Sequence, residues 1–174
     1  MEAVSLPVFV PEADRERLEP AIKKFRKEVF HRDYMPRIVS FAKARELLLR
    51  VKKSGIRIAL ATSSDQGDLA IYKRIVGMQD LVEEEATSAD AKASKPEPDI
   101  FAAALKKAGV GAEQAIALGD TPHDADAAGA LGIPVIGLTC GGWKRDDLLE
   151  AGCVEVYQDP ADLLLRFDES MLRK

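Results

Sequence analysis

The sequence has few cysteines, no long apolar run and no excess of basic charge. Only Cys140 and Cys153 occur among 174 residues, too few for a disulfide framework or a zinc site of paired cysteines. No window approaches the roughly 20 apolar residues of a membrane-spanning helix. The first ten residues also lack the basic start and long apolar run of a secretory signal. We therefore expect a cytoplasmic protein without a membrane anchor.

The charge balance excludes a second group of functions. The 29 acidic and 25 basic residues give a formal net charge of −4 and are distributed along the chain. Such a chain has no basic field to hold a nucleic acid or an anionic membrane surface. With 47% apolar and 31% charged residues, the length suffices for one well-buried core but not for two full domains.

Short β-rich runs alternate with helical patterns from residue 56 onward, which is typical of βαβ units and a parallel sheet. Residues 56–62 form an apolar run broken only by Arg57, as in a strand buried on both faces. The acidic run at 81–85 suits an edge strand better. The patterns predict strands at 56–62, 81–85, 115–118, 134–138 and 154–157, and helices at 42–53, 69–76, 98–108, 123–131 and 161–167. The predicted class is α/β, with a Rossmann-like parallel sheet and flanking helices.

The first forty residues do not follow this pattern. Residues 11–30 form a charged stretch with apolar residues at helical spacing, and they contain no βαβ unit. Residues 5–10 are apolar enough for a strand, but Pro7 would remove a backbone donor from its middle. We expect a helical appendage here.

Two polar segments are predicted at the carboxyl ends of strands, where open α/β sheets bind ligands. Thr62 and Ser63 end the first strand, and a hydroxyl with backbone N–H groups at a helix start can bind a phosphate oxyanion. Taken alone, the same hydroxyls are more typical of a helix N-cap. Lys95, held between prolines in the sequence Lys-Pro-Glu-Pro, could pair with the same anion, although a single lysine is more often a solvated surface group.

A third segment follows the strand at 115–118. Asp120 comes directly after Gly119, and Asp124 follows at the start of a helix. Carboxylates in this arrangement suit Mg²⁺, which keeps several water ligands and takes one or two protein carboxylates. Alternatively, the two acids cap the helix and stabilise its positive end. Further on, Gly141-Gly142-Trp143 could line the site or form a turn with a packing tryptophan, and we favour the turn.

The three segments together resemble the haloacid dehalogenase superfamily of hydrolases. They read Thr-Ser-Ser at 62–64, Ser-Lys-Pro-Glu-Pro-Asp-Ile-Phe at 94–101 and Gly-Asp-Thr-Pro-His-Asp at 119–124. The resemblance covers residues 34–167. Within the superfamily, the sequence resembles the branch that includes phosphoglycolate phosphatases and β-phosphoglucomutases. It implies hydrolysis of a small phosphorylated metabolite with Mg²⁺ as cofactor.

The resemblance also implies a role for each site residue. Thr62 matches the hydroxyl residue that binds the transferring phosphoryl group, and Ser63 matches the residue that supplies a backbone N–H. Lys95 matches the catalytic lysine that steadies the nucleophile and the phosphoryl charge. Asp120 matches a direct Mg²⁺ ligand, and Asp124 matches the second metal-site acid, which often acts through water. The metal would neutralise and orient the phosphoryl group.

The chain departs from the family pattern at its N-terminal end. Members begin with an apolar strand ending in Asp-x-Asp-x-Thr, whose first aspartate is the covalent nucleophile and whose second is the general acid/base. Neither Asp14 nor Asp33 has this context. Residues 1–37 instead resemble the remnant of a helical cap, leaving 38–174 as an incomplete core. Because the family's first strand lies between those ending at Thr62 and Gly119, we expect two unpaired edges and marginal stability.

Three interpretations of this departure are open. In the first, the chain is a fragment of a Mg²⁺-dependent phosphatase and is inactive alone because the nucleophile is absent. In the second, it is a non-catalytic module that binds phosphate and metal. In the third, it is half of a split enzyme, and a complementing chain supplies the missing strand. The substrate is not specified, because specificity depends largely on the cap.

Overall fold

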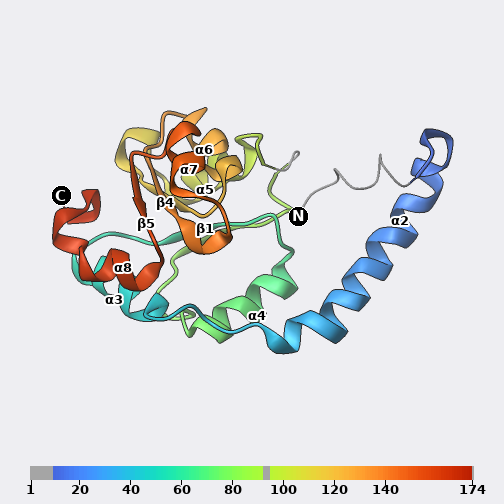
Figure 1. Ribbon diagram of the computed structural model, residues 1–174, viewed down its shortest axis with the longest axis horizontal. Coiled ribbons are helices and arrows are strands. Elements are labelled where there is room, and N and C mark those ends of the chain that lie inside the picture. Colours follow the sequence, from blue (N-terminus) through green and yellow to red (C-terminus); the bar gives the residue numbers. More distant parts are fainter. Residues whose placement is uncertain (1–9, 92–94, 174) are drawn as a thin grey trace. The chain divides into compact units, whose positions relative to one another are not determined.

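The computed structural model describes residues 10–91 and 95–173 (Figure 1). The chain forms two compact units, Met1–Val39 and Ser40–Lys174. The first unit is built on helix α2 (Glu12–Val29), which continues into one π-helical turn at Phe30–Tyr34 and a 3₁₀ turn at Met35–Arg37. The helix expected at residues 11–30 is therefore present. Residues 5–9, where a strand was considered, lie outside the described residues, as does Ser94 of the lysine motif.

The second unit contains two parallel sheets. Strand β1 (Ala59–Ala61) pairs with β2 (Glu84–Ala86), with Leu60 opposite Glu85. The other sheet has the order β3-β4-β5, formed by Ala117–Gly119, Val135–Leu138 and Glu155–Tyr157. All pairs are parallel, and the acidic strand β2 lies at an edge, as its composition predicted. The α/β class with a parallel sheet and flanking helices is confirmed.

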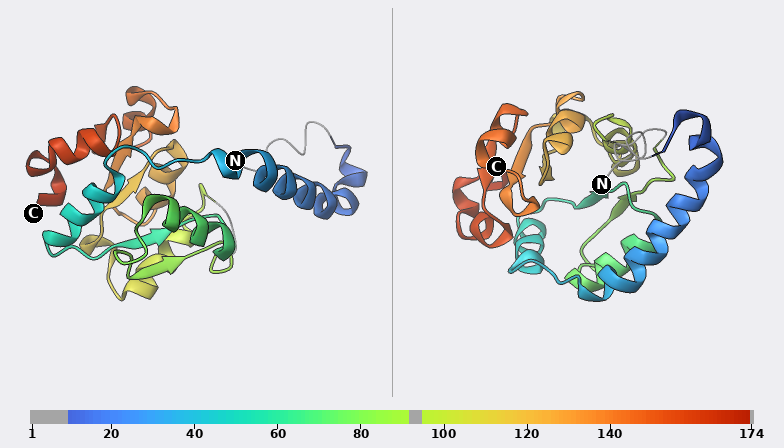
Figure 2. Two further views of the ribbon diagram at one scale, coloured as in Figure 1. Left: turned by 90° about the horizontal axis from the view of Figure 1, so that it is seen from below. Right: turned by 45° about the vertical axis from the view of Figure 1, so that its right-hand side comes forward.

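Helices cover both faces of these sheets. On one face, α5 (Asp99–Ala108) packs on β1 and β2, α6 (Pro122–Gly129) packs on β3 and β4, and α7 (Arg145–Glu150) packs on β4 and β5. On the other, α3 (Ala44–Lys53) packs against α8 (Pro160–Leu165), and the two lie side by side in cyan and red in Figures 1 and 2. Helix α4 (Gln66–Val76) follows β1.

The core is divided between these two faces. The α3/α8 face is filled by a cluster that includes Leu47, Ile136 and Leu163. The α6/α7 face is filled by a second cluster that includes Val135 and Leu148. Ile136, Leu148 and Leu163 are completely buried. The central strand β4 contributes to both clusters, which explains why its sequence is apolar at successive positions.

One helix was not predicted. Helix α7 has only six residues, four of them charged, so it shows little helical periodicity in the sequence. Its start is stabilised by Asp147, whose Oδ2 accepts a hydrogen bond of 3.1 Å from the backbone N–H of Lys144. Trp143, expected to pack in the preceding turn, is 42% exposed. Short helices of this kind depend on tertiary packing rather than on propensity.

The sheet is interrupted where the central strand was expected to be missing. Strands β1 and β3 belong to different sheets, and each has one pairing partner in the part of the chain that the structure describes. Leu118 of β3 is 44% exposed and the preceding Ile116 is 37% exposed, whereas Ile136 of β4 is fully buried. Residues two apart on a strand share a face, so one face of β3 exposes apolar side chains next to the strand's free edge.

Among the described helices, none combines the length and the apolar character that crossing a bilayer demands.

Candidate active site

Thr62 stands at the carboxyl end of β1. Its backbone N–H donates to the carbonyl of Ala86, at 3.0 Å, which fixes the end of the strand. Its Oγ1 accepts a hydrogen bond of 3.1 Å from the backbone N–H of Ser64. Helix α4 is capped instead by Asp65, whose Oδ1 accepts from the Asp68 N–H at 3.0 Å. The interpretation of Thr62 or Ser63 as a helix cap is therefore wrong, and the Thr62 hydroxyl proton is available to a ligand.

Lys95 reaches from the loop before α5 to the start of α6. Its Nζ lies 2.5 Å from Oδ1 of Asp124, and it also lies 5.4 Å from the centre of the Phe101 ring. The Lys95 side chain is 20% exposed and that of Asp124 is 8% exposed. Lys95 is thus not the solvated surface group that a single lysine usually is.

Asp124 also completes the cap of α6. Its Oδ2 accepts hydrogen bonds from the Thr121 backbone N–H at 3.1 Å, from the Thr121 Oγ1 at 2.8 Å and from the Asp120 N–H at 3.2 Å. Thr121 is the N-cap residue, and its Oγ1 accepts from the Asp124 N–H in return. The interpretation of Asp120 as the helix cap is therefore wrong, because Thr121 is the N-cap. Asp124 does stabilise the start of the helix, as the alternative had it, but its other carboxylate oxygen binds Lys95.

Two glycines allow the loops to meet at this position. A Cβ at Gly119 would lie 2.4 Å from the Cβ of Asp124, and one at Gly141 would lie 2.4 Å from the carbonyl oxygen of Asp120. The turn Thr139–Gly141, which follows β4, therefore packs directly on Asp120. Sequence reasoning considered that the Gly141-Gly142-Trp143 segment could line the site but favoured a plain turn, because a contact between loops after neighbouring strands leaves no local signal.

The two aspartates differ in their electrostatics. Burial raises the pKa of Asp120, and the neighbouring Asp124 carboxylate raises it further. Burial would also raise the pKa of Asp124, but Lys95 and the hydrogen bonds from Thr121 and the Asp120 N–H outweigh it, so that this pKa is lowered. Asp124 is therefore a fixed anion. In the described residues no ion pair joins Asp120 to a cationic side chain.

This donor set fits a hard divalent cation that keeps most of its water. Asp120 offers a half-buried carboxylate beside a second one, and a cation would relieve their repulsion. Asp124 has both oxygens engaged by protein donors, so it suits a water-mediated contact. Within residues 10–91 and 95–173, no cluster of three or more histidine, cysteine or acidic side chains could enclose a metal.

The structure unites only part of the predicted set. Hydrogen bonds link Asp124 to Lys95 and to Asp120. Lys95 donates from its side chain, and Asp120 donates from its backbone N–H. No hydrogen bond joins Thr62 or Ser63 to these three in the described part of the chain. Thr62 follows β1 and Asp120 follows β3, and each of these strands has one free edge in the described part of the chain. The candidate site therefore lies along the carboxyl ends of strands on both sides of the interruption.

Comparison with known proteins gives consistent results. A family profile described as haloacid dehalogenase-like hydrolase matches residues 6–138. A phosphoglycolate phosphatase from Rhodospirillum rubrum is 30% identical over 117 residues, which are 67% of this chain and 48% of that protein. The chain thus spans about half the length of this curated relative.

Two crystal structures extend the likeness to the fold. A hydrolase from Pseudomonas syringae superimposes with a TM-score of 0.76 at 29% identity, covering 92% of this chain and 72% of that one. A Thermotoga maritima protein assigned provisionally as a β-phosphoglucomutase gives a TM-score of 0.72 at 25% identity, covering 90% and 70%.

Proposed function

The chain belongs to the haloacid dehalogenase-like hydrolase family, and we propose that it carries the phosphate- and metal-binding part of a phosphatase active site for a small phosphorylated metabolite. The main support is the contact between Lys95 and Asp124 beside the half-buried Asp120. It places a cation and two carboxylates at the carboxyl end of β3, where a parallel sheet binds ligands. The name of the Rhodospirillum relative agrees with this substrate class.

Each residue has a role that its position supports. The Lys95 ammonium, fixed by Asp124, would attract and partly neutralise a phosphoryl oxygen. The Thr62 hydroxyl has an unused proton to donate, and the backbone N–H of the exposed Ser63 can add a second donor. Asp120 and Asp124 would hold Mg²⁺, which when bound supplies charge neutralisation at the phosphoryl group.

We further propose that turnover requires an aspartate-bearing strand between β1 and β3. The two strands have free edges, and Ile116 and Leu118 are exposed there. A parallel apolar strand in this position would pair both edges and bring its carboxyl end beside Thr62 and Asp120. In its absence no described carboxylate occupies the place of a nucleophile, and we expect the 174-residue chain alone to be inactive.

The source of that strand distinguishes the interpretations. It can be a covalently attached segment, which makes this chain a fragment, or a separate complementing chain, which makes the enzyme split. A module that binds phosphate and metal without turnover is the second candidate. Residues 1–37 are proposed as part of a cap and residues 38–174 as the core, in a protein of the cytoplasm.

Peptide complementation tests the proposal. An apolar peptide ending in Asp-x-Asp-x-Thr is added to the full chain with Mg²⁺, and hydrolysis of p-nitrophenyl phosphate is measured. We expect activity that is lost when the first aspartate of the peptide is replaced by asparagine, and lost with Lys95→Met. Lys43→Met is the matched control, because Lys43 also pairs with one carboxylate, that of Glu46 at 3.0 Å, but on the surface.

The possible results separate the two candidates. Activity only with the intact peptide supports the phosphatase. Binding of inorganic phosphate with Mg²⁺, but no turnover when the peptide is bound, would favour the non-catalytic module. If neither phosphate binding nor turnover occurs, both proposals are wrong.

A further inference from the structure

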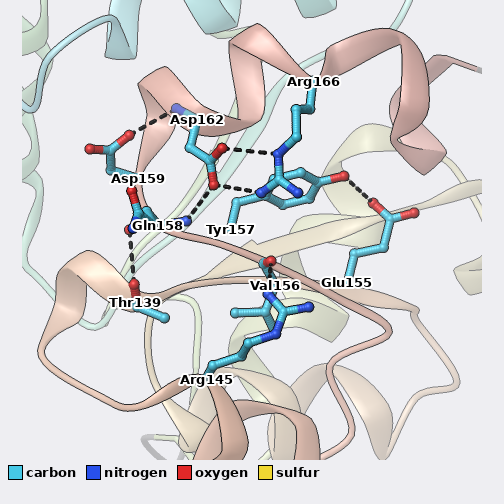
Figure 3. A network of polar contacts seen from close by, with 9 residues as sticks. All are labelled: Thr139, Arg145, Glu155, Val156, Tyr157, Gln158, Asp159, Asp162 and Arg166. Atoms are coloured by element: carbon cyan, nitrogen blue, oxygen red, sulfur yellow. Dashed lines mark hydrogen bonds and ion pairs between the residues drawn. The ribbon is translucent and has the colours of Figure 1, made fainter.

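A cavity of about 500 Å³ lies beside β5 and is not used by the proposed phosphatase site. It is lined by Thr139, Arg145, Tyr157, Gln158, Asp162 and Arg166 (Figure 3). Thr139 directly follows β4, and Gln158 directly follows β5. The cavity therefore lies at the carboxyl ends of two neighbouring parallel strands, which is the side of an open α/β sheet where ligands bind.

Arg166 is held in one orientation. Its Nε donates to Oδ1 of Asp162 at 2.9 Å and its Nη2 donates to Oδ2 at 2.6 Å. The guanidinium carbon lies 4.4 Å from the centre of the Tyr157 ring. A guanidinium that is held by two hydrogen bonds to a carboxylate and by contact with an aromatic ring loses little further conformational freedom when it binds a ligand. The Nη1 donors of Arg166 remain for that purpose.

Arg145 approaches the strand from the other side, as Figure 3 shows. One of its N–H groups donates to the backbone carbonyl of Val156. The other guanidinium donors have no acceptor among the residues that the structure describes. A carbonyl partner positions the side chain without neutralising it, so Arg145 keeps its full positive charge.

The lining carries a net positive charge. Arg145 and Arg166 are cationic, and Asp162 is the one acidic lining residue. Tyr157 is neutral near neutral pH, like an ordinary tyrosine, and burial and its hydrogen bond to Glu155 raise its pKa further, to about 12. Two nearby carboxylates are engaged elsewhere: Glu155 accepts from the Tyr157 hydroxyl and the Met171 N–H, and Asp159 caps α8 at the Asp162 N–H.

From this arrangement we propose that the cavity binds a small metabolite through a carboxylate or phosphate group held by Arg145 and Arg166. Guanidinium forks match the planar geometry of carboxylates and the oxygens of phosphates. The Gln158 side-chain amide can provide a neutral polar contact, whereas the Thr139 hydroxyl already donates to the Gln158 carbonyl oxygen at 3.2 Å. The volume falls within the range of roughly 300–1,000 Å³ that is typical of small-molecule sites.

Lys95 does not line the cavity, but one turn of the chain connects the cavity with the candidate active site. Thr139 lines the cavity, and Gly141 of the same turn packs on Asp120. A ligand that contacts Thr139 therefore touches the turn that supports the candidate metal ligand. The proposal does not depend on phosphatase activity, since it concerns binding alone.

The test follows the arginine Nε–H resonances of the full-length ¹⁵N-labelled chain by NMR. Succinate and inorganic phosphate are the two probes, each titrated into the millimolar range. We expect the Arg145 and Arg166 signals to shift together with one dissociation constant, and Arg145→Gln to weaken binding about tenfold or more. Arg57→Gln is the matched control, because Arg57 is also exposed and donates to a backbone carbonyl, that of Ala108 at 3.0 Å.

Two further variants sharpen the result. Asp162→Asn removes the one acidic charge of the lining, so it should tighten the binding of an anion several-fold, which a purely structural role would not do. Asp168→Asn is its control. Asp168 pairs with Arg50 at a distance of 2.7 Å, and neither residue lines the cavity. Lys95→Met should leave the affinity at Arg145 unchanged.

The outcomes are distinct. Shifts with succinate alone support a carboxylate ligand, and shifts with phosphate alone support a phosphorylated one. The proposal is overturned if neither probe shifts Arg145 and Arg166, or if Arg145→Gln and Arg57→Gln bind equally well. Loss of phosphate binding in Lys95→Met alone would place the anion at the candidate active site instead and would also overturn it.

Discussion

The Nζ of Lys95 lies 2.5 Å from Oδ1 of Asp124, although the two residues are 29 positions apart in the sequence. The contact joins the loop before α5 to the first turn of α6, and the same carboxylate holds the Thr121 cap. The Asp124 side chain thus connects the lysine that we propose binds phosphate with the start of a helix. Removing either partner should therefore affect both stability and binding.

Lys95→Met is expected to reduce the free energy of unfolding by about 1–3 kcal/mol, because it leaves a largely buried carboxylate without its cation. Urea unfolding at neutral pH measures the change. Lys43→Met, which breaks an exposed pair, should cost well under about 1 kcal/mol. Equal losses in the two variants would show that burial does not strengthen the Lys95 pair.

Gly141→Ala is expected to destabilise the protein by about 1–3 kcal/mol, because its Cβ would lie 2.4 Å from the Asp120 carbonyl oxygen and 2.7 Å from the Asp120 Cβ. Gly129→Ala is the control, since nothing lies within 4 Å of its Cβ position at the end of α6. That change should be neutral or stabilising by up to about 1 kcal/mol. Thermal unfolding compares the two, and a stable Gly141→Ala variant would refute the close packing of this turn.

Glu85 should contribute to stability in a pH-dependent way. Its hydrogen bond with Lys73 is the main influence that lowers its pKa below the ordinary 4.5. A carboxyl with a lowered folded-state pKa stabilises above its unfolded value, and the effect is lost as the pH falls through the folded value. Glu85→Gln should therefore cost about 1 kcal/mol near neutral pH, and the difference should fade as the pH falls below 4.5.

Denaturant unfolding of both proteins across this acidic range provides the measurement. Glu46→Gln is the comparison, because Glu46 pairs with Lys43 on the surface and should give a much smaller effect. A difference for Glu85→Gln that stays constant from neutral to acidic pH would contradict the argument.

Tyr157 should be the last tyrosine to ionise. Burial and the hydrogen bond to Glu155 raise its pKa from 10.0 to about 12. Because its folded-state pKa is raised, its contribution to stability is complete below 10 and is lost as the pH rises toward 12. Ultraviolet difference titration should show a tyrosinate step near 12 that Tyr157→Phe removes. If the step persists in the variant, its assignment to Tyr157 is wrong.

Much of the fold was readable because strands and helices leave local patterns. Residues 56–62 and 134–138 are apolar runs that contain β1 and β4, and Gly55 and Gly109 mark helix ends by their positive φ angles of 80° and 66°. Helix α7 was missed because six residues carry too little periodicity. Asp65, rather than Thr62 or Ser63, caps α4, since several adjacent residues can cap and only the backbone path selects among them.

The sequence by itself determined the α/β class, the order of the described strands and of every long helix, and the family, because these depend on residue types at fixed spacing along the chain. Only the tertiary structure decided that Lys95 binds Asp124, that Gly141 packs on Asp120, and that Arg145 and Arg166 line one cavity. Each of these contacts joins segments far apart in the chain. Their formation depends on how neighbouring strands and loops pack in three dimensions, and that packing has no local signature.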